Sequence, residues 1–496
     1  MNETFEFTAE LKKKLFIMMG VGLVGLALVF FLYPENNHAR LWANLLVNTY
    51  YFTGIAIFGM FAVAAGTLAY GSWHILVKRI FLSISSFSLI GGFLLAGIVI
   101  LGLVGAHSLY DGVKAIIHED HYNQIHTTKK VFFNPVFWLA RLFTYATLWA
   151  LFSWYMNKFF GRTDQTDPKV YKRSKLLAAA FIVVFAVSES AASWDYLMCL
   201  DAHWYSTMFG WYNFASYGCA AWAMTILLVI YLKSKGYMQR VNENHIHDLG
   251  KLLFGFSIFW TYVWFDQFML QWFANIPEET HYWVRRFDEG YFKFTVFLAL
   301  TINFVFPLFF LIKRGAKRNF RMIGFGAALL IFGHYVDFFN MAFFEPNRAP
   351  GHHHVAAASD ADKKEHGMNN SEKVVFLAQA AEHKEATHTD ATPAKENTDA
   401  VATEVKHEEH GEAAKAGDGH DAHAAEGGED HPKGGHHPEG HPVTNYAGIG
   451  IGEILVFFGF LGVFLFMFFN NLKKRPIIPE NDPYLKEAER IVVVYS

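Results

Sequence analysis

Ten long apolar runs limit this chain to a helical fold in a membrane. About 20 apolar residues in a helix, at 1.5 Å per residue, cross the hydrocarbon core of a bilayer. Of the 496 residues, 53% are hydrophobic and only 18% are charged. The runs occupy residues 14–33, 48–70, 82–105, 132–156, 174–200, 209–232, 251–274, 291–312, 321–344 and 449–470. The sequence therefore predicts an all-α integral membrane protein with about ten transmembrane helices.

The charge balance and the cysteines exclude several classes of function. A formal net charge of −3 gives no strongly basic surface for nucleic acid. Cys199 and Cys219, the only cysteines, form no CxxC or CxxCH pattern and no ligand spacing for zinc or iron–sulfur clusters. Intramembrane haem b needs paired histidines at similar depth, and only His334 lies well inside an apolar run. We expect no metal site in this chain and any redox centre in a partner.

Lysine and arginine residues near the ends of the apolar runs predict the orientation of the chain. Loops on the side of the N-terminus contain far more of these residues than loops on the opposite side. Cytoplasmic loops are enriched in lysine and arginine. We therefore expect both termini in the cytoplasm and the short loop from Asp201 to Met208 outside.

A polar, low-complexity stretch divides the sequence into three parts. Residues 1–350 contain the first nine apolar runs, residues 351–445 form the insert, and residues 446–496 contain the tenth run and a cytoplasmic tail. The insert holds more than half of the 25 histidines and almost no aromatic residues, so it cannot bury enough apolar surface to fold alone. It is interpreted as a disordered spacer outside the membrane, with binding of zinc, copper or nickel as the alternative.

Ionisable side chains inside or at the ends of the apolar runs are the candidate functional residues. Charged groups in a bilayer are costly, so each is a candidate by default. With the predicted orientation, they gather in the outer half of the membrane. His334 and Asp337 are three residues apart and therefore share one helix face. The full set is His107, Arg141, Glu189, Asp195, Asp201, Asp266, His334 and Asp337.

These side chains allow two kinds of chemistry and two structural alternatives. Carboxylates and imidazoles pass protons, and they can also bind the hydroxyl groups of a quinol. Asp195, Asp266, His334 and Asp337 are the main candidates for a proton route, with Glu189 and Asp201 beside them. As the alternatives, Arg141 forms a buried ion pair with Asp195 that fixes helix packing, and His334 with Asp337 is a hydrogen-bonded pair in the core.

One corner of the sequence resembles a known family. Residues 193–212 read SWDYLMCLDAHWYSTMFGWY. With ten helices, cytoplasmic ends and a histidine-rich insert before the last helix, this corner resembles the ActF subunits of bacterial alternative complex III. These are NrfD/PsrC-like membrane subunits of a quinol:cytochrome c oxidoreductase. The resemblance covers residues 1–350 and 445–496.

The resemblance implies a fold, a location and a set of partners. The fold would be two four-helix bundles, helices two to five and six to nine, flanked by the first and last helices in the bacterial inner membrane. The partners would be pentahaem and monohaem cytochrome c subunits, an iron–sulfur subunit, a sister NrfD-like subunit, small membrane subunits, lipids and, in a supercomplex, cytochrome c oxidase. Haem c and iron–sulfur clusters would belong to those partners.

The resemblance also implies a role in a respiratory electron-transport chain. By position, His107, Arg141 and Asp195 would line a region for a quinol, either menaquinol or ubiquinol. We expect a cofactor-free subunit that supplies a proton pathway, a quinol-site region or both. The alternatives are a scaffold that only anchors the haem and iron–sulfur subunits and, in a third class, a secondary transporter.

Overall fold

The computed structural model describes residues 4–118, 129–160, 168–202, 204–288, 290–342, 449–480 and 482–489. Every regular element in these ranges is a helix, and none of them is a strand. The insert predicted at residues 351–445, with its possible metal binding, lies outside the described residues. Nine helices in the described part are long and apolar enough to cross a membrane. The chain is therefore an all-α, multi-pass membrane protein.

The nine candidate spans follow the predicted runs closely. Five of them are single helices: α1 (Ala9–Leu32), α7 (Pro135–Phe160), α9 (Met208–Ser234), α15 (Phe320–Ala342) and α18 (Ile451–Leu472). A sixth is the greater part of α2 (Glu35–Leu68). The three others are composite. They are formed by α3 (Lys78–Ile84), η1 (Ser85–Phe87) and α4 (Ser88–Leu103), by α8 (Pro168–Tyr196) and η2 (Met198–Leu200), and by α12 (Gly290–Leu300), η3 (Thr301–Val305) and α13 (Phe306–Phe310). Short helices lie outside the spans: α5 (Asp111–His118), α11 (Pro277–Asp288), α14 (Arg314–Arg318) and α19 (Leu485–Glu489).

The run predicted as a seventh span differs from the others. Residues 251–274 belong to α10 (Glu243–Ala274), which has 32 residues and is long enough to cross a bilayer. It is nevertheless not among the nine helices that are also apolar enough. Asp266, Gln267 and a series of Trp and Tyr residues lower its mean hydropathy. Trp and Tyr pack well between helices, but their polar atoms give these residues low hydropathy values.

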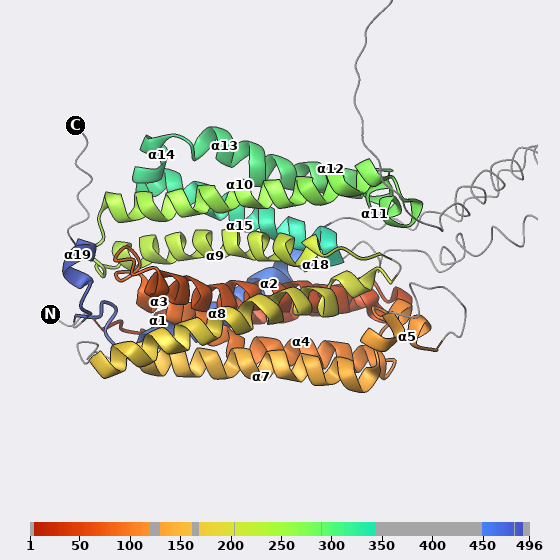
Figure 1. The fold of residues 1–496 in the computed structure, drawn as a ribbon, viewed down its shortest axis with the longest axis horizontal. Coiled ribbons are helices and arrows are strands. Elements are labelled where there is room, and N and C mark those ends of the chain that lie inside the picture. Colours follow the sequence, from red (N-terminus) through yellow and green to blue (C-terminus); the bar gives the residue numbers. More distant parts are fainter. Residues whose placement is uncertain are drawn as a thin grey trace, which may run out of the picture. The chain divides into compact units, whose positions relative to one another are not determined.

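The helices form two sets of neighbours that share an interface. In the first set, α2, α4, α7 and α8 contact one another, and in the second, α9 contacts α10 and α15, and α12 contacts α15 (Figure 1). Helices α2 and α8 also contact α9 and so join the two sets. The corner loop after η2 lies at the helix ends near α5 and α11, and α19 lies at the opposite end (Figure 1). We call these the corner end and the terminal end.

Glycine residues let the first and last spans touch through their backbones. A Cβ atom on Gly22 of α1 would lie only 2.3 Å from the Cα of Gly459 of α18, which is far inside normal contact distance. A Cβ on Gly25 would come within 2.8 Å of the backbone nitrogen of Val456, and one on Gly462 within 3.2 Å of the nitrogen of Met19. Small residues at such contacts are typical of helix pairs that pack in lipid. Helix α1 is otherwise mostly exposed, so α18 is its main support.

The segment that follows the last span connects several parts of the chain at the terminal end. We call residues 473–489 the C-terminal segment. Pro476 forms an isolated antiparallel β-bridge with Thr4. Asp482 accepts a hydrogen bond of 2.9 Å from Lys78 at the start of α3. Near α10, Glu489 accepts a bond of 2.8 Å from Arg240, and the backbone oxygen of Ala488 lies 2.8 Å from a ring nitrogen of His245.

Candidate functional site

Arg141 and Asp195 form a buried ion pair between α7 and α8 at the corner end. The guanidinium donates from Nε to Oδ2 at 3.0 Å and from Nη2 to Oδ1 at 2.7 Å. The Asp195 side chain is fully buried, and that of Arg141 is 13% exposed. Tyr145, one turn along α7, donates a third hydrogen bond of 3.1 Å to Oδ2 of Asp195. Both oxygens of the carboxylate are therefore engaged, as the alternative of a helix-packing ion pair requires.

His107 does not join this pair. Its Nε2 lies 2.9 Å from the backbone oxygen of Ile98, and its Nδ1 accepts a hydrogen bond from the backbone nitrogen of Leu109. The ring packs against Trp42, with 4.7 Å between the centroids. Burial lowers the pKa of His107, so the imidazole is neutral. The structure therefore does not bring these three residues together by hydrogen bonds, because His107 lies beyond the end of α4 and bonds to the backbone of its own segment.

Asp337 of α15 lies at the centre of a network that joins three helices. Tyr212 of α9 donates to its Oδ1. Its Oδ2 accepts a bond of 2.7 Å from Ser216 and one of 2.9 Å from the indole nitrogen of Trp260 on α10. The Asp337 side chain is 2% exposed, and no arginine or lysine in the described ranges forms an ion pair with it. We call these four residues, with His334, the Asp337 site.

His334 completes the Asp337 site. Its Nδ1 lies 3.0 Å from Oγ of Ser216, so one hydroxyl connects the imidazole to the carboxylate. The edge of the ring faces Trp260, and its Nε2 has no hydrogen-bond partner. Within the described residues, His334 and Asp337 do not bond each other directly, in contrast to the predicted hydrogen-bonded pair; Ser216 bonds both. Tyr212 and Ser216 were missed by the sequence analysis, although their spacing of four places both on one face of α9.

A small cavity opens beside Asp337. Arg286 of α11, Tyr282 and Asn340 are among the residues that line it. The Arg286 guanidinium stacks on the ring of Tyr282 at 3.4 Å and donates to the backbone oxygen of Tyr282 at 3.0 Å. The cavity has room for about one or two water molecules, which is too little for a quinol headgroup. Water in this place would connect Asp337 with the corner end.

The remaining candidate carboxylates lie apart from this network. Asp266 is half-buried on α10, and the described residues give it no hydrogen bond or ion pair. Asp201 is buried in the corner, where its charge acts on Lys129. Lys129 donates to the backbone oxygens of Ala202 and Trp204 at 2.6 and 2.9 Å. Burial lowers the pKa of Lys129 to about 8, and the charge of Asp201 opposes this shift. Asp201 therefore belongs to the anchoring of the corner loop.

A second cavity lies at the terminal end, under the C-terminal segment. It is lined by His74, Lys78, Asp482 and several tyrosines. Lys78 and Asp482 form a buried ion pair, with side chains 4% and 2% exposed. His74 is 2% exposed, and neither of its ring nitrogens has a hydrogen-bond partner. Burial lowers the pKa of His74 to about 3, and the charge of Lys78 acts in the same direction.

His74 is expected to make the fold sensitive to acid. Between about pH 6.5 and 3 the unfolded chain binds a proton at this residue and the folded chain does not, so stability falls as the pH falls. The variant His74→Leu should lose less stability than the parent protein between about pH 7 and pH 4. Thermal unfolding in detergent across this range measures the difference. Equal losses in the two proteins would contradict the assignment.

Comparison with known proteins does not assign this chain to a family. No protein-family model matches the chain, and no curated protein is significantly similar to it. The residues therefore define a class, a helical membrane protein with protonatable groups buried between its spans, and what the protein does is a matter for proposal.

Proposed function

We propose that this chain is a cofactor-free membrane subunit of a quinol:cytochrome c oxidoreductase of the alternative complex III type. It would lie in the bacterial inner membrane with both termini in the cytoplasm and its spans arranged as two four-helix bundles. Haem c and iron–sulfur clusters would be held by the partner subunits named above. This chain would carry protons near the periplasmic face while its partners carry electrons.

The Asp337 site is the observation that carries this proposal. Asp337 has three neutral donors and, within the described ranges, no cationic partner. Such a carboxylate is costly to bury in a bilayer, which makes a functional role the better explanation. The hydroxyl of Ser216 both donates and accepts, so it can exchange protons between Asp337 and His334. The cavity beside Asp337 supplies space for water toward the corner end. Together these groups favour proton transfer over a quinol pocket within this chain.

One feature favours the alternative of a pure scaffold. Arg141 and Asp195 satisfy each other fully, and Arg40 forms a second buried ion pair of 2.6 Å with Glu453, between α2 and α18. Pairs of this kind fix how helices pack and need no chemistry. The two functions predict different results for one substitution.

The substitution Asp337→Asn separates proton transfer from scaffolding. Asn keeps the shape and can accept hydrogen bonds, but it cannot exchange a proton. In the complex purified with its partners and placed in vesicles, we expect quinol-driven proton release to fall at least about tenfold. The matched variant Asp266→Asn removes a half-buried carboxylate outside the Asp337 site and should stay near the parent rate. Unchanged proton release in an assembled Asp337→Asn complex would show that the Asp337 site is structural.

The proposed partners are tested by purification in a mild detergent. Haem spectra and subunit masses should reveal a co-purifying multihaem cytochrome c. A lone, colourless protein would overturn the assignment to this class of complex.

A further inference from the structure

Four buried tyrosines lie on neighbouring helices near Glu189 and Asp195, and three of them have no role in the site described above. They are Tyr50 of α2, Tyr145 of α7, Tyr196 of α8 and Tyr217 of α9, each at most 6% exposed. Within the described residues, the hydroxyls of Tyr196 and Tyr217 make no hydrogen bond of normal geometry, although Glu189 lies near that of Tyr217. A buried hydroxyl without a partner is costly, so two in one region require an explanation. We call the four residues the tyrosine array.

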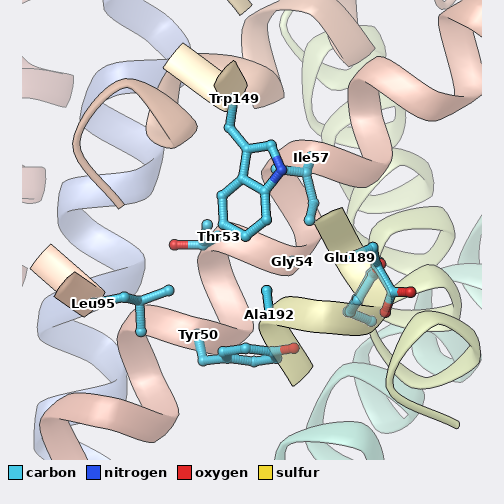
Figure 2. A pocket seen from close by; sticks show the side chains of 9 residues that line it. Tyr50, Thr53, Gly54, Ile57, Leu95, Trp149, Glu189 and Ala192 are labelled. Atoms are coloured by element: carbon cyan, nitrogen blue, oxygen red, sulfur yellow. The ribbon is translucent and has the colours of Figure 1, made fainter. Parts of the chain in front are cut away.

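Glu189 lies at one end of the tyrosine array. Figure 2 shows its carboxyl group in a cavity with Tyr50, Thr53 and Trp149. Ser190 donates to Oε2 at 3.3 Å, and Oε1 has no hydrogen-bond partner. No cation in the described ranges forms an ion pair with Glu189, although it is only 5% exposed. An ionised carboxylate is costly to bury in such a place.

The array continues from Glu189 toward Asp195 through neighbouring side chains. Tyr50 and Tyr217 line the same cavity as Glu189. The rings of Tyr50 and Tyr196 lie 6.2 Å apart. Tyr196 directly follows Asp195 on α8.

Tyr145 closes the far end of the array through its hydrogen bond of 3.1 Å to Asp195. The cavity beside Glu189 has room for about one water molecule, which can donate and accept between hydroxyls too far apart to bond directly.

We propose that the tyrosine array, with bound water, relays a proton between Glu189 and the Arg141–Asp195 pair. One O–H bond breaks at the donating carboxyl and one forms at the accepting carboxylate. Each hydroxyl on the way accepts one proton and donates another, and no electron moves. The relay rests on the proposed function and gives its proton route a second branch, independent of the Asp337 site.

Replacement of single hydroxyl groups tests the relay. The variants Tyr196→Phe and Tyr217→Phe keep the ring and its packing and remove only the oxygen. The matched control is Tyr51→Phe on α2, because Tyr51 is equally buried but donates to the backbone oxygen of Ile331 at 2.8 Å. In the vesicle assay we expect each array variant to lower proton release several-fold and the control to leave it near the parent level. A second readout is the infrared band of the Glu189 carboxyl, identified by Glu189→Gln, which should shift in Tyr217→Phe and not in Tyr51→Phe.

The outcomes separate this inference from the function on which it rests. If Asp337→Asn lowers proton release and the array variants behave like Tyr51→Phe, the relay is wrong and the proposed function stands. If the array variants lower it and Asp337→Asn does not, protons pass through the relay alone. If no variant changes proton release, both proposals fail.

Discussion

Replacement of Arg141 by Met is expected to destabilise the folded protein by about 3–5 kcal/mol, the usual effect of removing one partner from a buried ion pair. Asp195 has no exposed surface, and Arg141 supplies two of its hydrogen bonds. Without the guanidinium, a buried carboxylate remains with only the hydroxyl of Tyr145. Unfolding by denaturant in one detergent, monitored through the helix content, measures the loss of stability.

Two further variants show whether burial causes this effect. The double variant Arg141→Met/Asp195→Leu removes both charges and should recover much of the lost stability, because no charge is then left unpaired. Arg240 also pairs with a carboxylate at 2.8 Å, but both side chains are more than a third exposed. Arg240→Met should therefore cost about 1 kcal/mol or less. Equal losses for Arg141→Met and Arg240→Met would contradict the role given to burial.

A leucine at Gly22 is expected to separate α1 from α18. Its Cβ alone would lie 2.3 Å from the Cα of Gly459. Backbone atoms cannot rotate away from such a clash as a flexible side chain can. The helices must move apart, which also loses the close contacts of Gly25 and Gly462. Overpacking of a tight contact costs about 1–3 kcal/mol, and we expect a loss at the upper end because α1 has little other support.

Gly20 provides a control on the same helix, two residues away. A Cβ at this position meets nothing within 4 Å. Gly20→Leu should therefore leave the unfolding midpoint almost unchanged, or raise it slightly, since leucine favours a helix more than glycine does. Proteolysis of the short link between α1 and α2 gives an independent readout, and cleavage should be faster in Gly22→Leu only. The same cleavage rate in both variants would show that the glycine contact does not hold α1.

The spans could be predicted from the sequence because lipid imposes a simple rule on length and composition. The span predicted at residues 251–274 is not confirmed, because Asp266, Gln267 and the aromatic residues lower the mean hydropathy of α10, although this helix is long enough to span. The rule also does not show that α3 and α4 are joined by a 3-10 turn, Ser85–Phe87. Local hydrogen bonds of the serine side chains accompany this break, and a count of apolar residues does not detect it.

The candidate site was predictable only in part. Spacing placed His334 and Asp337 on one face, but it could not show that Ser216 bonds both or that Trp260 reaches Asp337. These partners come from other helices, and a single sequence carries no signal for contacts between them. The tyrosine array could not be predicted from the sequence for a further reason. Tyrosines are expected wherever a helix meets the membrane interface, so four buried ones do not stand out among the 22 in the chain.

The packing of α1 on α18, together with the reach of the C-terminal segment, has a consequence for how the protein is made. The ribosome makes α18 after the eight other candidate spans of the described part, α1 included. Asp482, the partner of Lys78 in α3, is made later still. In the nascent protein α1 therefore lacks its main packing partner until α18 has been made, and a chain that stops before α18 never gains it.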